Sequence, residues 1–312
     1  MAEDSLPRRI KRLRSESPSH PDDKACIHHD KHRDKESSMP QTLAEPDATS
    51  TGSILHEPAE VYHAQADRYL SSHQLADFRR CPLLYQKKKS GLIGDQDRPA
   101  FVVGRALHTL VLEGRWQFER EYAIGGPINE KTGKPYGAQT KAFAEWAAGH
   151  GKQVLTDVQY ELVEKMAAGV RAHSIAVDYL GSGEAEVVAR AEYGGMPCQI
   201  RMDHFDVHRG IIDLKTADDL DYFQVDAKRY GYVYQVAFYR GVLRQVISVP
   251  MPVHFIAVEK KEPFRCGVWR VHEDVLTQAE KENEAAIGRL RSCQEMDNWP
   301  TGYSELRVFD VF

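Results

Sequence analysis

The run Gly210-Ile211-Ile212-Asp213-Leu214-Lys215-Thr216 joins an apolar stretch to two charged side chains, and it decides the expected fold. Side chains alternate between the two faces of a strand, so Asp213 and Lys215 share one face and Leu214 points to the other. An Asp and a Lys two residues apart would be an ordinary surface pair on an exposed strand, but the apolar residues of this run are typical of a core strand. The run therefore predicts a carboxylate and an ammonium group at the polar end of a buried strand.

Strand and helix patterns on both sides of this run predict an α/β fold. Alternation predicts strands at 185–193 and 196–207, joined by a hairpin turn at Gly194-Gly195, and two further strands at 253–258 and 264–271. Apolar residues at helical spacing predict a helix that opens near Ser71 and others over the following ranges: 101–112, 138–149, 154–180, 230–243 and 273–296. This order of elements predicts one mixed central β-sheet flanked by helices.

A second carboxylate is expected beside Asp213. Asp203 lies toward the end of the preceding strand, and the short turn at 208–210 lets a hairpin bring the two aspartates side by side. Two adjacent carboxylates repel each other unless a cation neutralises them, and oxygen ligands suit Mg²⁺ or Mn²⁺. Lys215 can then orient a water molecule or stabilise charge on an attacked phosphate. The three residues predict metal-assisted phosphodiester hydrolysis, and Glu186 on the first strand is a further candidate metal ligand.

The first 60 residues differ in composition from the rest of the chain. Residues 1–60 contain no Phe, Trp or Tyr and are rich in Ser, Pro, Asp, Lys and His. Such a segment cannot bury enough apolar surface to offset its ordering entropy, so we expect a disordered polar tail followed by one domain over 61–312. Cys26 and the histidines that follow it could be interpreted as metal ligands, but no second ligand pair accompanies them.

The overall composition is that of a globular protein, with 42% apolar and 28% charged residues and a net charge of −5. No apolar run is long enough to span a membrane, and the first residues lack the apolar stretch of a signal peptide. The five cysteines are scattered without a C-x-x-C pair, which favours reduced thiols and a cytoplasmic location. An iron–sulfur cluster is not expected, because it needs four close thiolates.

Four blocks of the sequence together resemble the PD-(D/E)xK nuclease superfamily, and within it the exonuclease VIII branch of RecE-type phage recombination exonucleases. One block is the run at 210–216 together with Asp203, and the others are 70–75, 104–113 and 230–239. The resemblance covers about residues 62–272, in the family's order. Two departures are Met202, where the family has proline, and Asp213, where many relatives have the longer glutamate.

The resemblance implies roles for further residues. His108 and Glu113 would lie beside the metal as ligand and support, and Gln235 and Tyr239 would face the strand from one side of the following helix, since they are spaced i, i+4. On the residues alone, His108 could equally be a packed core histidine and the other two an ordinary pair at the core edge. The candidate metal ligands are then His108, Glu113, Glu186, Asp203 and Asp213. The candidate catalytic residues are Asp203, Asp213, Lys215, Gln235 and Tyr239. Mg²⁺ is the implied cofactor, with Mn²⁺ as a substitute.

Basic residues gather around the first two motif blocks and give that half of the chain a local positive excess, which suits a DNA backbone. An alternative is that each lies on an ordinary solvated helix face. The candidate DNA-binding residues are Arg79, Arg80, Lys87, Lys88, Lys89 and Arg105.

The resemblance implies an exonuclease that degrades double-stranded DNA from its ends in the 5′-to-3′ direction during phage-type recombination. A single-strand annealing protein is the implied partner, and a homo-oligomer is the implied assembly. One alternative is a structure-specific or restriction-like endonuclease on the same core. The other is a non-catalytic DNA-binding recombination module, although such a module would not need Asp203, Asp213 and Lys215 together.

Overall fold

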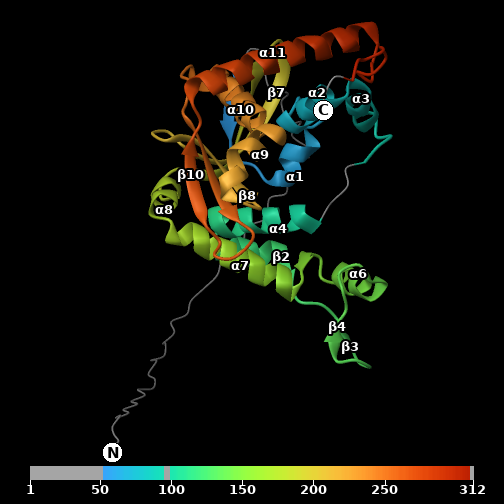
Figure 1. Ribbon diagram of the computed structural model, residues 1–312, viewed down its shortest axis with the longest axis vertical. Helices are drawn as coiled ribbons and strands as arrows, with labels where there is room; N and C mark the ends of the chain where they lie inside the picture. Colours follow the sequence, from blue (N-terminus) through green and yellow to red (C-terminus); the bar gives the residue numbers. More distant parts are fainter. Residues whose placement is uncertain (1–51, 95–98, 310–312) are drawn as a thin grey trace, which may run out of the picture. The chain divides into compact units, whose positions relative to one another are not determined.

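A six-stranded mixed β-sheet forms the centre of the fold in the computed structural model, which describes residues 52–94 and 99–309 (Figure 1). The strand order is β1-β6-β7-β8-β9-β10, with β8 and β9 parallel and the other neighbours antiparallel. These strands are β1 (Ser53–Leu55), β6 (Glu184–Tyr193), β7 (Met196–Asp206), β8 (Gly210–Ala217), β9 (Val253–Glu259) and β10 (Cys266–Arg270). The predicted mixed sheet flanked by helices is confirmed, including the three consecutive antiparallel strands around the motif.

Helices pack on both faces of this sheet. They are α1 (Ala59–Ala64), α2 (Ser72–Arg80), α3 (Pro82–Lys89), α4 (Pro99–His108), α5 (Arg115–Glu121), α6 (Lys141–Ala148), α7 (Asp157–Ala172), α8 (Ser174–Leu180), α9 (Phe223–Arg229), α10 (Tyr232–Ile247) and α11 (Glu273–Met296). Two small sheets lie outside the central one: β2 (Tyr122–Ile124) with β5 (Gln153–Leu155), and β3 (Ile128–Asn129) with β4 (Lys134–Pro135). Within the described ranges, no helix is both long and apolar enough to cross a membrane.

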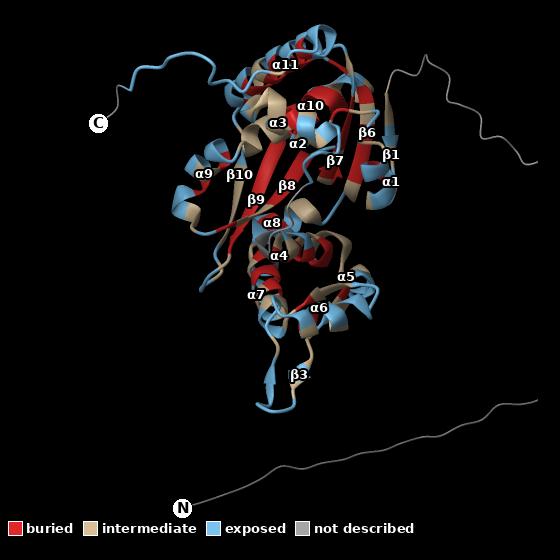
Figure 2. Cartoon of the chain, turned by 90° about the vertical axis from the view of Figure 1, so that its right-hand side faces the viewer, coloured by how far each residue is buried: buried red, intermediate tan, exposed pale blue. Residues whose placement is uncertain are grey.

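The central sheet separates two hydrophobic cores. On one face, α2, α10 and α11 pack Leu75 and Phe238 against residues such as Ile200 on β7. On the other face, α4 and α7 pack Leu107 against Leu214 on β8. Figure 2 shows β8 and β9 as buried along most of their length. Strands covered on both faces are expected to be nearly continuous apolar runs, so the charged residues within β8 stand out.

The turn that leads into β8 depends on two residues. The Oδ1 atom of Asp206 accepts hydrogen bonds from the backbone N–H groups of His208 (2.7 Å) and Arg209 (2.9 Å). Gly210 follows with φ of 85°, and a Cβ atom at this position would lie 2.0 Å from the carbonyl oxygen of Pro252. Only glycine therefore lets β8 start so close to the segment that leads into β9.

Two of the predicted helices are interrupted. Residues 154–180 form the end of β5, then α7, and then α8 after a break at His173, whose ring Nδ1 caps α8 by accepting from the backbone of Ala176 (3.2 Å). The predicted helix at 101–112 is α4 followed by a π-helical turn, η1 (Thr109–Glu113), which the N–H of Gly114 closes by donating to the carbonyl of Thr109 (2.9 Å). Apolar spacing continues through both breaks, which explains why the sequence pattern missed them.

Part of the predicted polar tail, residues 52–60, is structured. Strand β1 pairs with β6 at Ser53–Leu55, and α1 begins at Ala59, so the predicted tail boundary at residue 60 is wrong. Glu57 forms an ion pair with Arg190 of β6, and both side chains are almost buried. Strand β1 is only three residues long and is stabilised by its pairing with β6. Its sequence is therefore too short to show the alternation of apolar and polar residues that would predict a strand. Residues 1–51, with Cys26 and its neighbouring histidines, lie outside the described residues.

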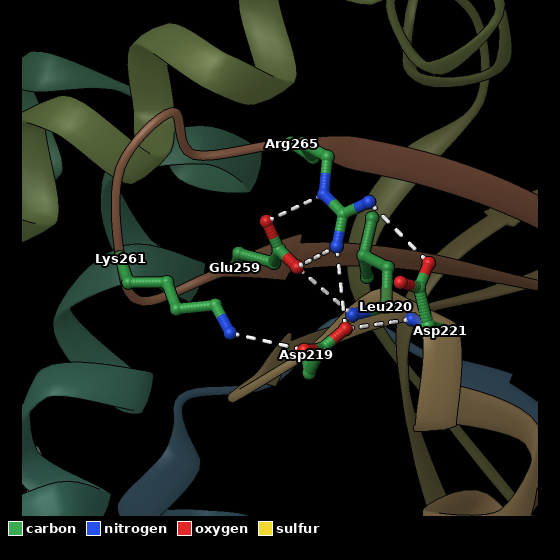
Figure 3. A network of polar contacts seen from close by, with 6 residues as sticks. All are labelled: Asp219, Leu220, Asp221, Glu259, Lys261 and Arg265. Carbon is green, nitrogen blue, oxygen red and sulfur yellow. Dashed lines mark hydrogen bonds and ion pairs between the residues drawn. The ribbon is translucent and has the colours of Figure 1, made fainter.

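A network of charged side chains fixes the chain beyond the end of β8 (Figure 3). Arg265, after β9, donates to the carboxylate of Glu259 through Nε (2.9 Å) and a terminal nitrogen (2.6 Å), and it also donates to Asp219 (3.2 Å). Glu259 accepts in addition from the backbone N–H of Leu220 (3.0 Å). The network attaches the short helical turn η2 (Leu220–Tyr222) to β9, so the segment after the motif strand has a defined position.

Candidate active site

Asp213 and Lys215 form an ion pair on β8, as alternation predicted. The Nζ atom of Lys215 lies 2.5 Å from Oδ1 of Asp213, which is completely buried, while Lys215 is 13% exposed. Oδ1 of Asp213 has this ammonium group as its partner, whereas Oδ2 is buried and, among the described residues, has no hydrogen-bond donor. Burial raises the pKa of Asp213, Lys215 opposes this, and Asp203 adds to it, so the net pKa is raised. Burying a carboxylate with so few donors costs free energy, and groups with a pKa shifted in this way concentrate at functional sites.

Lys215 remains positively charged in this environment. Burial lowers the pKa of Lys215, but the charges of Asp213 and Asp203 outweigh that effect, so the pKa is raised. The ammonium group is therefore fully protonated near neutral pH. It can stabilise negative charge on a bound phosphate, but it cannot accept a proton as a general base.

Asp203 joins this pair from the neighbouring strand. Its Oδ2 atom accepts a hydrogen bond from the backbone N–H of Leu214 (2.9 Å), the residue between Asp213 and Lys215. The paired register of β7 and β8 ends with His204 opposite Ile212, one residue before the two aspartates, and the charge of Asp203 raises the pKa of Asp213, so the two carboxylates lie close together. The predicted juxtaposition of the two aspartates is present, and β7 extends three residues beyond Asp203 before its turn.

The sheet is distorted at this position. Met202 and Phe205 both lie in the core beside α10, although their spacing should place them on opposite faces of β7. The β6–β7 register pairs Ala185 with His204 and Val187 with Met202 but skips Glu186 and Asp203 between them, and Glu186 has φ of 57°, a value that non-glycine residues rarely adopt. Such strained backbone is concentrated at functional sites.

Glu186 is paired with a cation that sequence reasoning missed. The Nε atom of Arg201 lies 2.9 Å from Oε2 of Glu186, and the two side chains are 23% and 17% exposed. Burial raises the pKa of Glu186, Asp203 raises it further, and Arg201 opposes both, leaving it well above its usual range. The available signal was a lone arginine in an apolar strand, two residues before Asp203. In this structure Glu186 belongs to an ion pair at the rim of the aspartates.

His108 and Glu113 reach the site from the end of α4. The Nδ1 atom of His108 lies 3.5 Å from Oδ2 of Asp203. Burial lowers the pKa of His108 more than Asp203 raises it, so the ring is neutral near pH 7 and able to serve as a ligand. The π-helical turn η1 separates the two residues by one widened turn, and Glu113 is close enough to Glu186 and Arg201 for their charges to interact. Burial raises the pKa of Glu113, and its neighbour Glu121 raises it further.

Gln235 and Tyr239 contact each other on α10. The Nε2 atom of Gln235 donates to the hydroxyl of Tyr239 (2.8 Å), as their i, i+4 spacing allows. Tyr239 is almost fully buried, which raises its pKa, and the charges of Asp203 and Asp213 raise it further. The tyrosine hydroxyl thus lies within electrostatic range of both aspartates, at the inner edge of the site.

The donor atoms at this site are suited to a hard divalent cation. Asp213 offers a buried Oδ2 atom without a hydrogen-bond donor, and Asp203 offers the oxygen that does not bind Leu214. Among the described residues, no set of three His, Cys, Asp or Glu side chains is arranged to hold a metal ion. Mg²⁺ commonly binds one or two carboxylates and completes its coordination with water and substrate phosphate. A two-carboxylate site of this kind fits Mg²⁺ better than a metal that needs a complete protein cage.

The predicted DNA-binding residues fall into three kinds of environment. Arg79 is held within the fold: its guanidinium lies over the ring of Tyr234 at 3.4 Å and donates to Asn283 at 2.8 Å. Lys88 pairs with Asp77 (2.7 Å), and Lys89 donates to the backbone carbonyl of Ala66 (2.8 Å). The remaining candidates are exposed: Arg80, Lys87 and Arg105. A role for any of them in DNA binding stays a prediction.

The comparisons with known proteins agree with this geometry. A family model described as "PDDEXK-like domain of unknown function (DUF3799)" matches residues 71–307. The chain belongs to this family. The match includes every candidate catalytic and metal-binding residue, from His108 to Tyr239. No curated protein matches the chain in sequence.

A solved structure shares the fold. The 2.19 Å crystal structure described as "Putative exonuclease" from Eubacterium rectale superposes with a TM-score of 0.61 over 83% of this chain and 97% of that chain. The two sequences are 17% identical, so the likeness establishes the fold and not the reaction. Together, the family match and the shared fold place the chain in the PD-(D/E)xK superfamily with a nuclease-like core.

Proposed function

We propose that this protein is a Mg²⁺-dependent DNA nuclease that degrades linear double-stranded DNA from its ends. The observation that carries the proposal is the buried carboxylate of Asp213, which has Lys215 as its one partner, has a second oxygen without a donor, and feels the charge of Asp203. A buried carboxylate with a raised pKa and an open oxygen, beside a second carboxylate and a lysine, supports a role in cation and phosphate chemistry.

The side chains divide the chemistry among them. Asp203 and Asp213 would hold the cation, and Asp203 is oriented by the N–H of Leu214. A divalent cation bound there would polarise the scissile phosphate and acidify a nearby water molecule. Lys215, which stays protonated, would stabilise the charge that builds up on the phosphate oxygens. Neutral His108 would supply a further ligand or orient Asp203.

The finer parts of the proposal rest on the resemblance of the four sequence blocks to RecE-type exonucleases. These parts are 5′-to-3′ polarity, a homo-oligomeric assembly, a cytoplasmic role in phage-type recombination and cooperation with a single-strand annealing protein. The neighbour from Eubacterium rectale bears the name of an exonuclease, which supports attack from DNA ends over internal cleavage.

Incubation with end-labelled linear duplex and with closed circular duplex tests the proposal. We expect Mg²⁺-dependent loss of the linear substrate, release of label from 5′ ends first, intact circles, and no product in EDTA. An Asp213→Asn preparation purified in parallel controls for contaminating nucleases. Nicked or linearised circles would instead support the endonuclease alternative. Absence of products from both substrates, with DNA retained by the protein, would support the non-catalytic module.

A further inference from the structure

A row of aromatic and cationic side chains leads from Lys215 to the surface. The Nζ atom of Lys215 lies 5.0 Å from the ring centroid of Tyr232, at the start of α10. The ring of Tyr232 lies 5.8 Å from that of Tyr230, and the guanidinium of Arg229 lies over Tyr230 at 5.7 Å. The site is thus connected to solvent by consecutive ring contacts, which we call the tyrosine path (Lys215, Tyr232, Tyr230 and Arg229).

Exposure increases along the tyrosine path. Lys215 is 13% exposed, Tyr232 is half-buried against the core, and Tyr230 is 58% exposed. Gly231 separates the two tyrosines with φ of 77°, a left-handed conformation at the N-cap of α10, directly after Tyr230, the C-cap of α9. This turn lets both rings project at the same junction between helices, one toward the site and one toward solvent.

The hydroxyl groups of the two tyrosines in the path have no hydrogen-bond partner among the described residues, unlike that of a tyrosine that links two helices. Tyr234, one turn further along α10, is different: its hydroxyl donates to Glu282 (2.7 Å) and its ring lies under Arg79. Tyr234 therefore links two helices, whereas Tyr230 presents an aromatic ring to solvent without a structural partner for its hydroxyl.

The charges around Tyr230 suit a phosphate backbone. Lys228 and Arg229 are both exposed in the last turn of α9, immediately before Tyr230. Asp226 is the acidic residue on the same helix, so the end of α9 carries one net positive charge. Aromatic rings beside cations are the surface chemistry that binds single-stranded nucleic acid, because each base offers a face for stacking and each phosphate a negative charge.

We propose that Tyr230, supported from behind by Tyr232, is a stacking platform for an unpaired base of the DNA strand that enters the site at Lys215. This proposal rests on the proposed nuclease function and narrows its substrate to DNA with an unpaired strand end, as an overhang or a frayed terminus. Bases inside a duplex have both faces covered by their neighbours, so an exposed tyrosine ring can stack only where a strand is open. Lys228 and Arg229 would contact the phosphates of that strand.

Equilibrium binding in EDTA tests this platform without cleavage. The probes are fluorescent duplexes that are identical except that one is blunt and the other carries a short single-stranded overhang, and the readout is anisotropy. Tyr230→Ala should weaken binding of the overhang duplex by about tenfold and leave blunt-duplex binding nearly unchanged. Tyr230→Phe should bind like the wild type, and Tyr230→Leu should bind like the alanine variant, because stacking requires a ring and not merely an apolar surface.

Tyr303→Ala is the matched control. Tyr303 is 76% exposed and lies beneath the guanidinium of Arg307 at 4.3 Å, so it is also a surface tyrosine–arginine pair, but it is not part of the tyrosine path. Its loss should not change binding of the overhang duplex. Circular dichroism and melting temperature of each variant establish that it is folded.

The outcomes separate this platform from the nuclease proposal. Equal overhang binding by Tyr230→Ala and wild type, equal effects of Tyr230→Ala and Tyr303→Ala, or full binding by Tyr230→Leu would each overturn the platform even if Mg²⁺-dependent cleavage is observed. Wild-type protein that shows no preference for the overhang duplex would overturn it as well. A selective loss in Tyr230→Ala and Tyr230→Leu, with no cleavage by wild type under any condition, would support the platform and refute the nuclease.

Discussion

Two buried carboxylates on the parallel strands β8 and β9 have opposite environments. Asp213 and Glu259 are both completely shielded from solvent. The oxygens of Glu259 accept three hydrogen bonds, two from Arg265 and one from the backbone of Leu220, and the Arg265 bonds hold the pKa of Glu259 below its usual value. Asp213 has one partner, the ammonium group of Lys215 at Oδ1, its Oδ2 has no donor among the described residues, and burial raises its pKa.

The contrast distinguishes a structural carboxylate from a functional one. A buried ionised group is tolerated when hydrogen bonds replace its lost hydration, as around Glu259. Where fewer bonds are present, as around Asp213, burial raises the free energy of the charged form, and an oxygen without a donor is available to a ligand. Both carboxylates are shielded from solvent, so the smaller supply of donors is what distinguishes Asp213 from Glu259.

Neutralising each carboxylate in turn should produce opposite changes, and this is the largest effect we expect. Asp213→Asn should reduce cleavage of linear DNA by orders of magnitude while the melting temperature changes little, because the variant relieves the burial of a charged carboxylate but also removes the partner of Lys215. Glu259→Gln should lower the free energy of unfolding by about 1–2 kcal/mol, a range reduced by the partial exposure of Arg265, and should retain cleavage. Rate assays and chemical denaturation of both variants measure the two effects. A loss of stability in Asp213→Asn equal to that in Glu259→Gln would remove the distinction.

Lys215 sharpens the same comparison, since it is the one cation that pairs with Asp213. Lys215→Ala should reduce turnover by orders of magnitude with little change in Mg²⁺ or DNA affinity, because an ammonium group cannot ligate a cation. Lys215→Arg should restore little activity, because a planar guanidinium does not fit the position of a compact ammonium group. Single-turnover cleavage and calorimetric Mg²⁺ titration provide the readouts.

Lys281→Ala, which removes an exposed lysine from α11, is the control for Lys215→Ala and should change neither quantity. Normal cleavage by Lys215→Ala would mean that Lys215 is a structural residue. Loss of Mg²⁺ affinity in parallel with the rate would mean that it positions the carboxylates instead of acting on the phosphate.

The sequence was sufficient for the part of the site that follows strand geometry. Alternation placed Asp213 and Lys215 together and Leu214 in the opposite core, and hairpin pairing brought Asp203 beside them. These features depend on near neighbours, so their pattern is visible in a short stretch. The mixed sheet follows from the same local rules applied to the neighbouring strands.

The sequence was insufficient where a long-range contact decides the outcome. Arg79 looked like a surface cation within a basic cluster, but its partners Glu282 and Asn283 lie more than 200 residues away in the chain. The π-helical turn after His108 follows an uninterrupted apolar pattern, so nothing local marks it. Arg201 was missed because a single charge within a strand does not reveal whether its partner is solvent or a glutamate on the next strand.

Glu186 is less deeply buried than Asp213 and Glu259, and it is paired with a single cation, Arg201. A double-mutant cycle measures the free energy of coupling between Glu186 and Arg201. Glu186→Gln, Arg201→Met and the double variant should give a coupling free energy of about 1–2 kcal/mol, because both side chains are largely buried. The exposed pair Lys141–Glu145, whose side chains are 89% and 68% exposed, is the control and should couple by no more than about 0.5 kcal/mol. Equal coupling in the two pairs would show that Arg201 does not stabilise the rim of the site.

Asp206 provides the smallest expected effect and extends the comparison to the other end of the hairpin. It resembles Glu259 in being supplied with donors: Ser182 first, then the backbone N–H groups of His208 and Arg209, which together lower the pKa of Asp206 to about 2. Because the folded-state pKa is below the unfolded value of 3.8, the ionised carboxylate stabilises the fold above about pH 4, and this contribution is lost as pH falls toward 2.

Asp206→Asn lacks the titration, so its melting temperature should be lower than that of the wild type at pH 5 and should approach it as the pH is lowered through this window. Melting curves of both proteins between these pH values test the sign. If the difference in melting temperature between the two proteins stays constant with pH, the turn depends on the shape of the Asp206 side chain. The hydrogen bonds to its negative charge would then add nothing to the stability of the fold.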